Sequence, residues 1–281
     1  KENMNLDVQG FRPCVVYVNG KYLGIHNLRS KVNKEHIEAT YNIPSGSYDF
    51  LSKWGIVEEG SNEDYLYLFN DLLDADLSVT ENFEAVAEEM DLENFTDYMV
   101  SELFVRNTGS WLFNIKIYRS HDNGKWQWFL VDLDRGFAGN TSFDLDFYGQ
   151  FNSNIENWAS DDNFAAKFLN KLWNNESYQN YFIQRYVTHL ATTFHHQQFI
   201  EKLKLFRSNI EYEMPRQIER WVGATSSYGD AIPSFEYWQK ETQQMGFFAH
   251  RRGLNLLYDL FDHTDYTEII NVNLLSYPNN G

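Results

Sequence analysis

The sequence predicts an α+β fold, in which β-hairpins near the N-terminal end precede a largely helical C-terminal part. Two observations support this prediction. An Asn-Gly turn joins two β-rich runs early in the chain, and stretches with helical spacing of apolar residues fill most of the sequence after residue 161. The length allows one large domain or two small ones. We expect residues 1–281 to form one domain, with a β-rich part over 1–60 and a mixed hairpin and helical part over 61–281.

The composition narrows the class of protein. The 281 residues are 43% hydrophobic and 17% aromatic, which argues against disorder. With 23 Lys+Arg, 40 Asp+Glu and a net charge of −17, the chain is too acidic to favour nucleic acid as a partner. One cysteine excludes an intramolecular disulfide and a multi-cysteine zinc site. No apolar run reaches about 18 residues, so we expect no membrane span.

The first hairpin is the strongest local signal. The runs 14–18 and 21–28 flank Asn19-Gly20, a pair that favours a tight two-residue turn because both positions require positive φ. Cys14 lies in a valine-rich strand, and we expect it to be a small buried hydrophobic residue.

The middle of the chain predicts mostly helices. Pro44, Gly46 and Gly55 indicate an irregular segment over 43–54. A wide apolar stripe predicts a helix from Leu92 to Val105 that ends near Asn107-Thr108-Gly109. Two earlier helices are predicted as well, one over 64–73 from its apolar spacing and one that starts within 78–81 and continues over 82–90.

A second hairpin is predicted over 112–134, with strands at 112–118 and 126–134. A two-residue turn at Asn123-Gly124 pairs position 114 with 133, whereas a three-residue turn over 122–124 pairs position 114 with 132. We favour the three-residue turn. After this hairpin, helices are predicted at 161–173, 177–194, 198–221 and 237–261, with Pro215 kinking or splitting the third, and a short strand at 269–275.

Two carboxylates at the end of the return strand suggest chemistry. Because strands have period two, Asp132 and Asp134 are expected on one side, where their mutual repulsion favours a divalent cation. Mg²⁺ prefers carboxylate oxygens and often binds together with substrate phosphates. The alternative is structural: one aspartate caps a turn and the other pairs with Arg135. With the three-residue turn, Asn114 would lie beside Asp132 and offer an amide oxygen as a further metal ligand.

Other clusters are interpreted as structural. His189, His195 and His196 fall on or beside a predicted helix, where surface histidines are more common than metal ligands. The cluster 250–252 is expected to form a solvated or salt-bridged helix face. The chain lacks a Gly-x-Ser-x-Gly elbow, a P-loop and a His-Glu-x-x-His motif, so nucleophilic hydrolase chemistry has no support.

Four segments, taken together and in order, resemble the spore-coat CotH-like kinase family. These are the Asn-Gly hairpin with Tyr-x-Gly over 15–29, the Asn-rich segment 107–118, the Trp-rich strand ending in Asp-x-Asp over 126–139, and the Phe-x-x-x-Arg ending over 247–252. The resemblance implies an atypical protein-kinase-like fold. It also implies binding of ATP and Mg²⁺ by Asn114, Lys116, Asp132 and Asp134, with Asp132, Asp134 and Asn114 as the metal ligands, and phosphate transfer to protein hydroxyls.

The sequence also departs from that family. Gly109 stands where the family usually has the aspartate that orients the attacking hydroxyl, Ser30 stands where it often has glutamate, and Arg252-Gly253 replaces Arg-Pro. Further N-terminal family motifs are expected to be missing. Two hypotheses follow: a secreted or cell-surface protein kinase that binds a nucleotide and a protein substrate, or a catalytically impaired pseudokinase or surface interaction module. Carbohydrate binding on exposed aromatic residues is a third.

Overall fold

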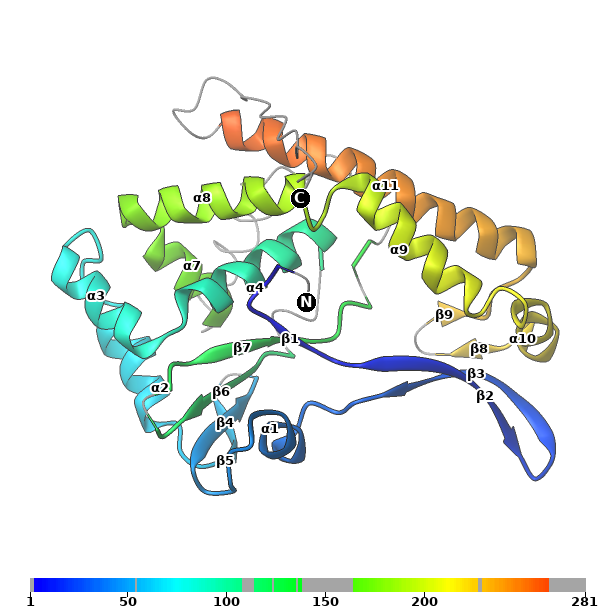
Figure 1. The fold of residues 1–281 in the computed structure, drawn as a ribbon, viewed down its shortest axis with the longest axis horizontal. Helices are drawn as coiled ribbons and strands as arrows, with labels where there is room; N and C mark the ends of the chain where they lie inside the picture. Colours follow the sequence, from blue (N-terminus) through cyan, green and yellow to red (C-terminus); the bar gives the residue numbers. More distant parts are fainter. Residues whose placement is uncertain are drawn as a thin grey trace, which may run out of the picture.

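The computed structural model describes residues 3–53, 55–107, 114–122, 124–134, 136–137, 164–226 and 229–262. A five-stranded sheet and its covering helices form one end of the elongated molecule, and a long β-ribbon extends away from them beside three helices (Figure 1). The predicted order, N-terminal strands followed mostly by helices, is confirmed. Within the described residues, no helix is long and apolar enough to cross a membrane.

The strands of the described residues are β1 (Asp7–Val8), β2 (Phe11–Val18), β3 (Lys21–Arg29), β4 (Tyr48–Ser52), β5 (Ile56–Glu59), β6 (Lys116–Ser120), β7 (Gln127–Leu130), β8 (Thr225–Ser226) and β9 (Gly229–Asp230). The helices of the described residues are α1 (Lys34–Tyr41), α2 (Glu63–Tyr67), the π-helix η1 (Leu68–Leu72), α3 (Thr80–Glu89), α4 (Leu92–Val105), α7 (Phe164–Leu172), α8 (Glu176–Ala191), α9 (His196–Ser208), α10 (Met214–Trp221) and α11 (Phe235–Asp262).

The five-stranded sheet has the order β1-β7-β6-β4-β5, and only the β1–β7 pair is parallel. Both faces of its central strands are buried. Leu51, Ile117 and Trp128 belong to the main core with α4, while the next residue along the strand in each of β6 and β7, Tyr118 and Phe129, packs in a smaller core with α1. Strands buried on both faces require adjacent apolar residues, and each of these strands has such a pair: Phe50-Leu51, Ile117-Tyr118 and Trp128-Phe129.

The first hairpin forms as predicted. β2 and β3 are antiparallel, and the turn residues Asn19 and Gly20 have φ values of 51° and 75°. The prediction for Cys14 is wrong, because this residue is exposed. The ribbon is a separate two-stranded sheet with most of β2 open to solvent, so a valine-rich strand here does not imply a buried one.

The helix predictions are largely confirmed, with α4 matching its expected bounds. The stretch 198–221 is split into α9 and α10, and Pro215 lies in the first turn of α10, where proline needs no backbone donor. The segment 43–54 is not wholly irregular, because β4 pairs with both β5 and β6. The predicted strand at 269–275 lies outside the described residues.

Helix α4 is buried along nearly its whole length, from Asn94 to Val105. Its polar side chains therefore need partners inside the protein. Asn94 extends the sheet: its Oδ1 atom accepts a hydrogen bond from the Trp128 N–H at 2.6 Å, and its Nδ2 group donates to the carbonyls of Asn5 and Trp128.

Asp97 is the second buried polar residue of α4. Arg185 of α8 donates to both of its carboxylate oxygens, His189 Nε2 lies 3.0 Å from Oδ1, and the Asn5 N–H donates to Oδ2 at 2.6 Å. Burial raises the pKa of Asp97, but the hydrogen bonds from the imidazole, the guanidinium and the backbone outweigh it and hold this pKa below its usual value.

Two groups that were expected on the surface are buried instead. His189 is 2% exposed because its ring reaches Asp97, and Arg252 is fully buried, with Nη2 donating to the Leu103 carbonyl at 2.8 Å. His195 and His196 are half-buried, and the His196 ring lies 4.9 Å from that of His250. Periodicity cannot reveal these contacts, because the partners come from distant segments.

We expect Asp97→Ala to lower the free energy of unfolding by about 3 kcal/mol, because it leaves Arg185 and the Asn5 N–H without their buried acceptor. Chemical denaturation measures this change. Glu93→Ala serves as a control, since Glu93 contacts the same guanidinium but is exposed, and it should cost less than about 1 kcal/mol.

The same carboxylate predicts a pH dependence. Its pKa is lower in the folded state than the unfolded value of about 3.9, so its contribution is complete above that pH and is lost as pH falls through the folded pKa. The stability difference between wild type and Asp97→Asn should therefore shrink on acidification below about pH 4. A difference that stays constant down to the acid transition would contradict this assignment.

Candidate functional site

The chain leaves the sheet before it reaches the two predicted acidic residues. β7 ends at Leu130, and Asp132 has a φ of 58°, a left-handed conformation that no strand continues through. The predicted strand over 126–134 is therefore too long. Strand periodicity cannot place Asp132 and Asp134 on one side, because the backbone between them is irregular.

The register of the second hairpin also differs from the prediction. Ile117 pairs with Trp128 and Tyr118 with Gln127, a register that, if continued, sets Asn114 opposite Val131. The register predicted from a three-residue turn pairs position 114 with 132, so that register is wrong by one residue. Even so, the Asn114 Nδ2 group donates a hydrogen bond to Asp132 Oδ2, because both residues lie beyond the paired parts of their strands.

The C-terminal end of α4 holds the Asp132 segment in place. The Asn107 side chain donates to the Asp132 carbonyl at 3.2 Å, and the Phe137 N–H donates to the Val105 carbonyl at 2.7 Å. Gly136 packs so closely that an added Cβ would lie 3.2 Å from the Val105 Cβ. The helix thus fixes the segment on both sides of Asp134.

A buried carboxyl group lies behind this segment. Burial raises the pKa of Glu102 well above its usual value; the hydrogen bond from the Asn107 side chain opposes that shift, and the charge of Asp132 adds to it. Glu102 is 1% exposed, and removal from water disfavours the charged form of a carboxyl group. The half-buried Asp132 thus lies close enough to this more deeply buried carboxyl group for its charge to raise the pKa of Glu102.

Asp132 and Asn114 line a cavity of about 380 Å³. This volume lies within the usual range for small-molecule sites. The cavity wall combines two acidic side chains, Glu58 and Asp132, with four basic ones. The basic residues are Arg29, Lys31, Lys53 and Lys116. In a chain of net charge −17, the wall of this cavity therefore has a local excess of positive charge.

Lys116 is the most enclosed of these cations. Its Nζ group donates to the Val32 carbonyl at 2.5 Å and lies 5.3 Å from the centre of the Phe50 ring. Burial lowers the pKa of Lys116; nearby Glu58 opposes this shift and Lys31 reinforces it. A partly desolvated ammonium interacts more strongly with an anion than one in bulk water.

The predicted site residues are thus brought together only in part. Asn114, Lys116 and Asp132 share one cavity, whereas Asp134 lines a separate cavity of about 730 Å³. Arg29 lines both cavities and lies between them. Gly109 lies outside the described residues.

Sequence reasoning missed the four other charged residues that line the cavity. Arg29 and Lys31 fall in a run from residue 8 to 34 that contains no acidic residue, a signal that could have identified them. Lys53 lies in the β4–β5 turn and Glu58 lies in β5, and no local pattern connects them with Asp132. Only the sheet order brings that turn beside β6.

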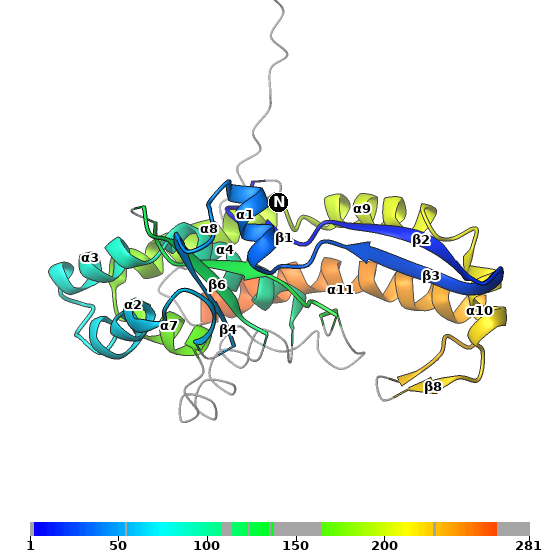
Figure 2. The same cartoon turned by 90° about the horizontal axis from the view of Figure 1, so that it is seen from below.

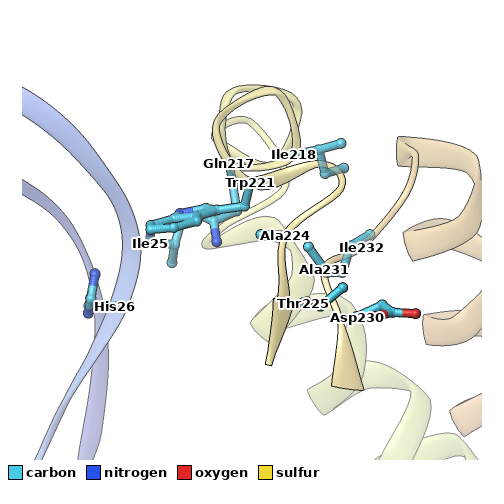
Figure 3. Close-up of a pocket in the computed structure, with 10 residues that line it drawn as sticks. All are labelled: Ile25, His26, Gln217, Ile218, Trp221, Ala224, Thr225, Asp230, Ala231 and Ile232. Atoms are coloured by element: carbon cyan, nitrogen blue, oxygen red, sulfur yellow. The ribbon is translucent and has the colours of Figure 1, made fainter. Parts of the chain in front are cut away.

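Another cavity, of about 500 Å³, lies between β3, α10 and the β8–β9 hairpin (Figure 3). Gln217 and Trp221 point from α10 toward β3, where the Gln217 side-chain oxygen accepts from the Ile25 N–H and Trp221 Nε1 donates to the Leu23 carbonyl, both at 2.8 Å. Gly24 permits this close approach, since a Cβ would lie 2.3 Å from Gln217 Oε1. These polar groups are used in packing the ribbon, so this cavity is not our candidate site.

The described tryptophans do not form an exposed aromatic row. Trp126, Trp128 and Trp238 are buried, and Trp173 and Trp221 are half-buried. The described part of the chain therefore offers no exposed tryptophan platform for carbohydrate binding.

N-terminal strands followed mostly by helices define a protein of the α+β class, and its candidate cavity is lined by strands and the segments between them. Comparison with protein families matches residues 1–256 to the CotH kinase protein family. The match covers most of the 281 residues, so the chain belongs to the CotH kinase protein family. A search of curated proteins found no match.

We expect Asn107→Leu to destabilise the protein by about 1–3 kcal/mol, because it removes the hydrogen bonds to the Asp132 carbonyl and to Glu102. Hydrogen exchange should show a loss of protection at residues 132–137 beyond the global change. Asn27→Leu, at an exposed position of β3, is a matched control and should leave that segment unchanged. Unaltered protection in Asn107→Leu would show that α4 does not hold the segment.

Proposed function

We propose that the cavity beside Asp132 binds a nucleoside triphosphate with Mg²⁺, and that the protein transfers phosphate to protein hydroxyls. One observation carries this proposal: four basic side chains meet an Asp132–Asn114 pair in a single cavity of an otherwise acidic chain. Membership of the CotH kinase protein family supports it.

The basic residues suit the triphosphate. Arg29, Lys31, Lys53 and Lys116 come from the end of β3, the following segment, the β4–β5 turn and β6, so they surround the cavity from several elements. Each of these four basic residues would attract an anion that carries several negative charges. The partial burial of Lys116 strengthens its share, since charges interact more strongly away from bulk water.

The donor set suits Mg²⁺. In the bond with Asp132 the donor is the Asn114 amide nitrogen, so the amide oxygen is not used in that bond and can serve as a ligand. Asp134 is the second proposed carboxylate, although it lines the adjoining cavity. No group of three or more metal-binding side chains occurs among the described residues, and Mg²⁺ needs none, because it keeps waters and shares substrate phosphates. Bound Mg²⁺ would neutralise charge on the transferred phosphoryl group.

Gly109 favours a second candidate, a nucleotide-binding pseudokinase. The family resemblance places an aspartate at this position, where it would orient the attacking hydroxyl. A chain that keeps Asp132 but lacks that carboxylate can bind nucleotide while transferring phosphate slowly. We also propose a secreted or cell-surface location, on the resemblance to spore-coat proteins.

ATP with Mg²⁺ should raise the thermal midpoint of the wild-type protein, because a ligand at 100 times its Kd stabilises the folded state by about 2.7 kcal/mol. Asp132→Asn and Lys116→Met should largely abolish the shift, which differential scanning fluorimetry measures. Asp134→Asn should weaken the Mg²⁺ dependence less. Lys125→Met, on the exposed β6–β7 turn, is the control. An unchanged shift in Asp132→Asn would exclude the metal assignment.

Gly109→Asp should increase phosphate transfer to a protein acceptor, measured with γ-labelled ATP, by roughly 10²–10⁴-fold if the missing carboxylate limits the reaction. Gly109→Asn is the matched control, since it adds similar volume without a base. A Gly109→Asp protein that binds nucleotide and gains no activity would show that the missing base is not the limitation.

A further inference from the structure

Positive charge is concentrated in one segment of this acidic protein. Residues 8–34 contain no aspartate or glutamate, although the whole chain has 40 of them. We call residues 8–34 the basic ribbon. Its five cations are Arg12, Lys21, Arg29, Lys31 and Lys34.

The basic ribbon consists mainly of β2 and β3, which extend away from the five-stranded sheet (Figure 1) and run beside α9 and α11 (Figure 2). The ion pairs formed between described residues involve none of its five cations. In a chain with an excess of carboxylates, these positive charges are left for a ligand or partner.

Apolar side chains lie among the charges. Val15, Tyr17, Val18 and Leu28 are between 42% and 68% exposed and lie on the two paired strands of the ribbon. A surface that mixes exposed apolar and aromatic side chains with cations has the composition of a protein-binding surface.

The edge of the ribbon favours recognition through side chains. Among the described residues, β2 is hydrogen-bonded to no strand other than β3. Pro13 lies in β2 and has no N–H group, which prevents a regular ladder with an added strand. A partner is therefore expected to lie across the ribbon surface and not to extend the sheet.

The ribbon leads to the cavity beside Asp132, because Arg29 and Lys31 belong to both. We propose that the basic ribbon docks an acidic, apolar-containing segment of a separate acceptor protein and directs its hydroxyl-bearing residue toward that cavity. The identity of the docked protein as an acceptor rests on the proposed function, whereas the docking itself rests on the ribbon's charge and exposed apolar residues.

Charge complementarity selects this occupant. Nucleic acid would be repelled by the rest of a chain with net charge −17. A second copy also offers acidic surface, but contact between the ribbon of one copy and the body of another joins two different surfaces. Such a contact would assemble copies into rings, filaments or a reciprocal dimer, so self-association in sedimentation distinguishes this occupant from a separate protein.

The test uses the full chain and a fluorescein-labelled peptide with serine flanked by glutamate and leucine residues, with binding measured by fluorescence anisotropy without nucleotide. We expect Arg12→Glu combined with Lys21→Glu to weaken binding at least about tenfold, since each reversed charge replaces attraction by repulsion. Added salt should weaken wild-type binding. Lys125→Glu is the charge-matched control, because Lys125 is exposed on the β6–β7 turn, and it should bind like wild type.

Four results would overturn the docking proposal. They are equal binding by the doubly reversed variant, tighter binding of a peptide with lysine in place of glutamate, stronger competition by poly-dT than by the unlabelled peptide, and self-association in sedimentation that the double reversal abolishes. Circular dichroism confirms that the variant is folded. Peptide binding without any phosphate transfer in the presence of ATP and Mg²⁺ would contradict the kinase proposal but not the proposed docking surface.

Discussion

The burial of α4 is the constraint on which the rest of the structure depends. A helix surrounded by protein cannot leave polar side chains unsatisfied, and α4 carries several of them. Asn94 meets this requirement by bonding to the backbone of β7, and Asp97 does so through α8 and the N-terminal segment. One helix therefore ties the sheet, the C-terminal helices and the start of the chain together.

The same helix places the candidate site. Its C-terminal end contacts the segment that carries Asp132, and Asn107 fixes the carbonyl of that residue in a backbone conformation that a free chain rarely adopts. Asp132 then faces basic residues supplied by β3, β4–β5 and β6. The local chemistry is thus assembled from segments that meet only because both the sheet and α4 are in place.

Positive and negative charges are distributed unevenly over this molecule. Most of the chain is acidic, whereas the cations that face the proposed nucleotide and acceptor lie in the basic ribbon and around the cavity. A negatively charged body disfavours non-specific binding of polyanions, while a local positive surface can still attract a phosphate group or an acidic peptide. In this arrangement, net charge alone is a poor guide to what the protein binds.

The sequence by itself determined the α+β class, the Asn-Gly hairpin and the bounds of α4, because turn chemistry and helical spacing act over a few residues. It also singled out Asn114 and Asp132. Only the tertiary structure decided the register between β6 and β7, the exposure of Cys14, the burial of His189 and the separation of Asp134 from Asp132. These features depend on contacts between distant segments, whose free energies exceed the local preferences that a sequence pattern reports.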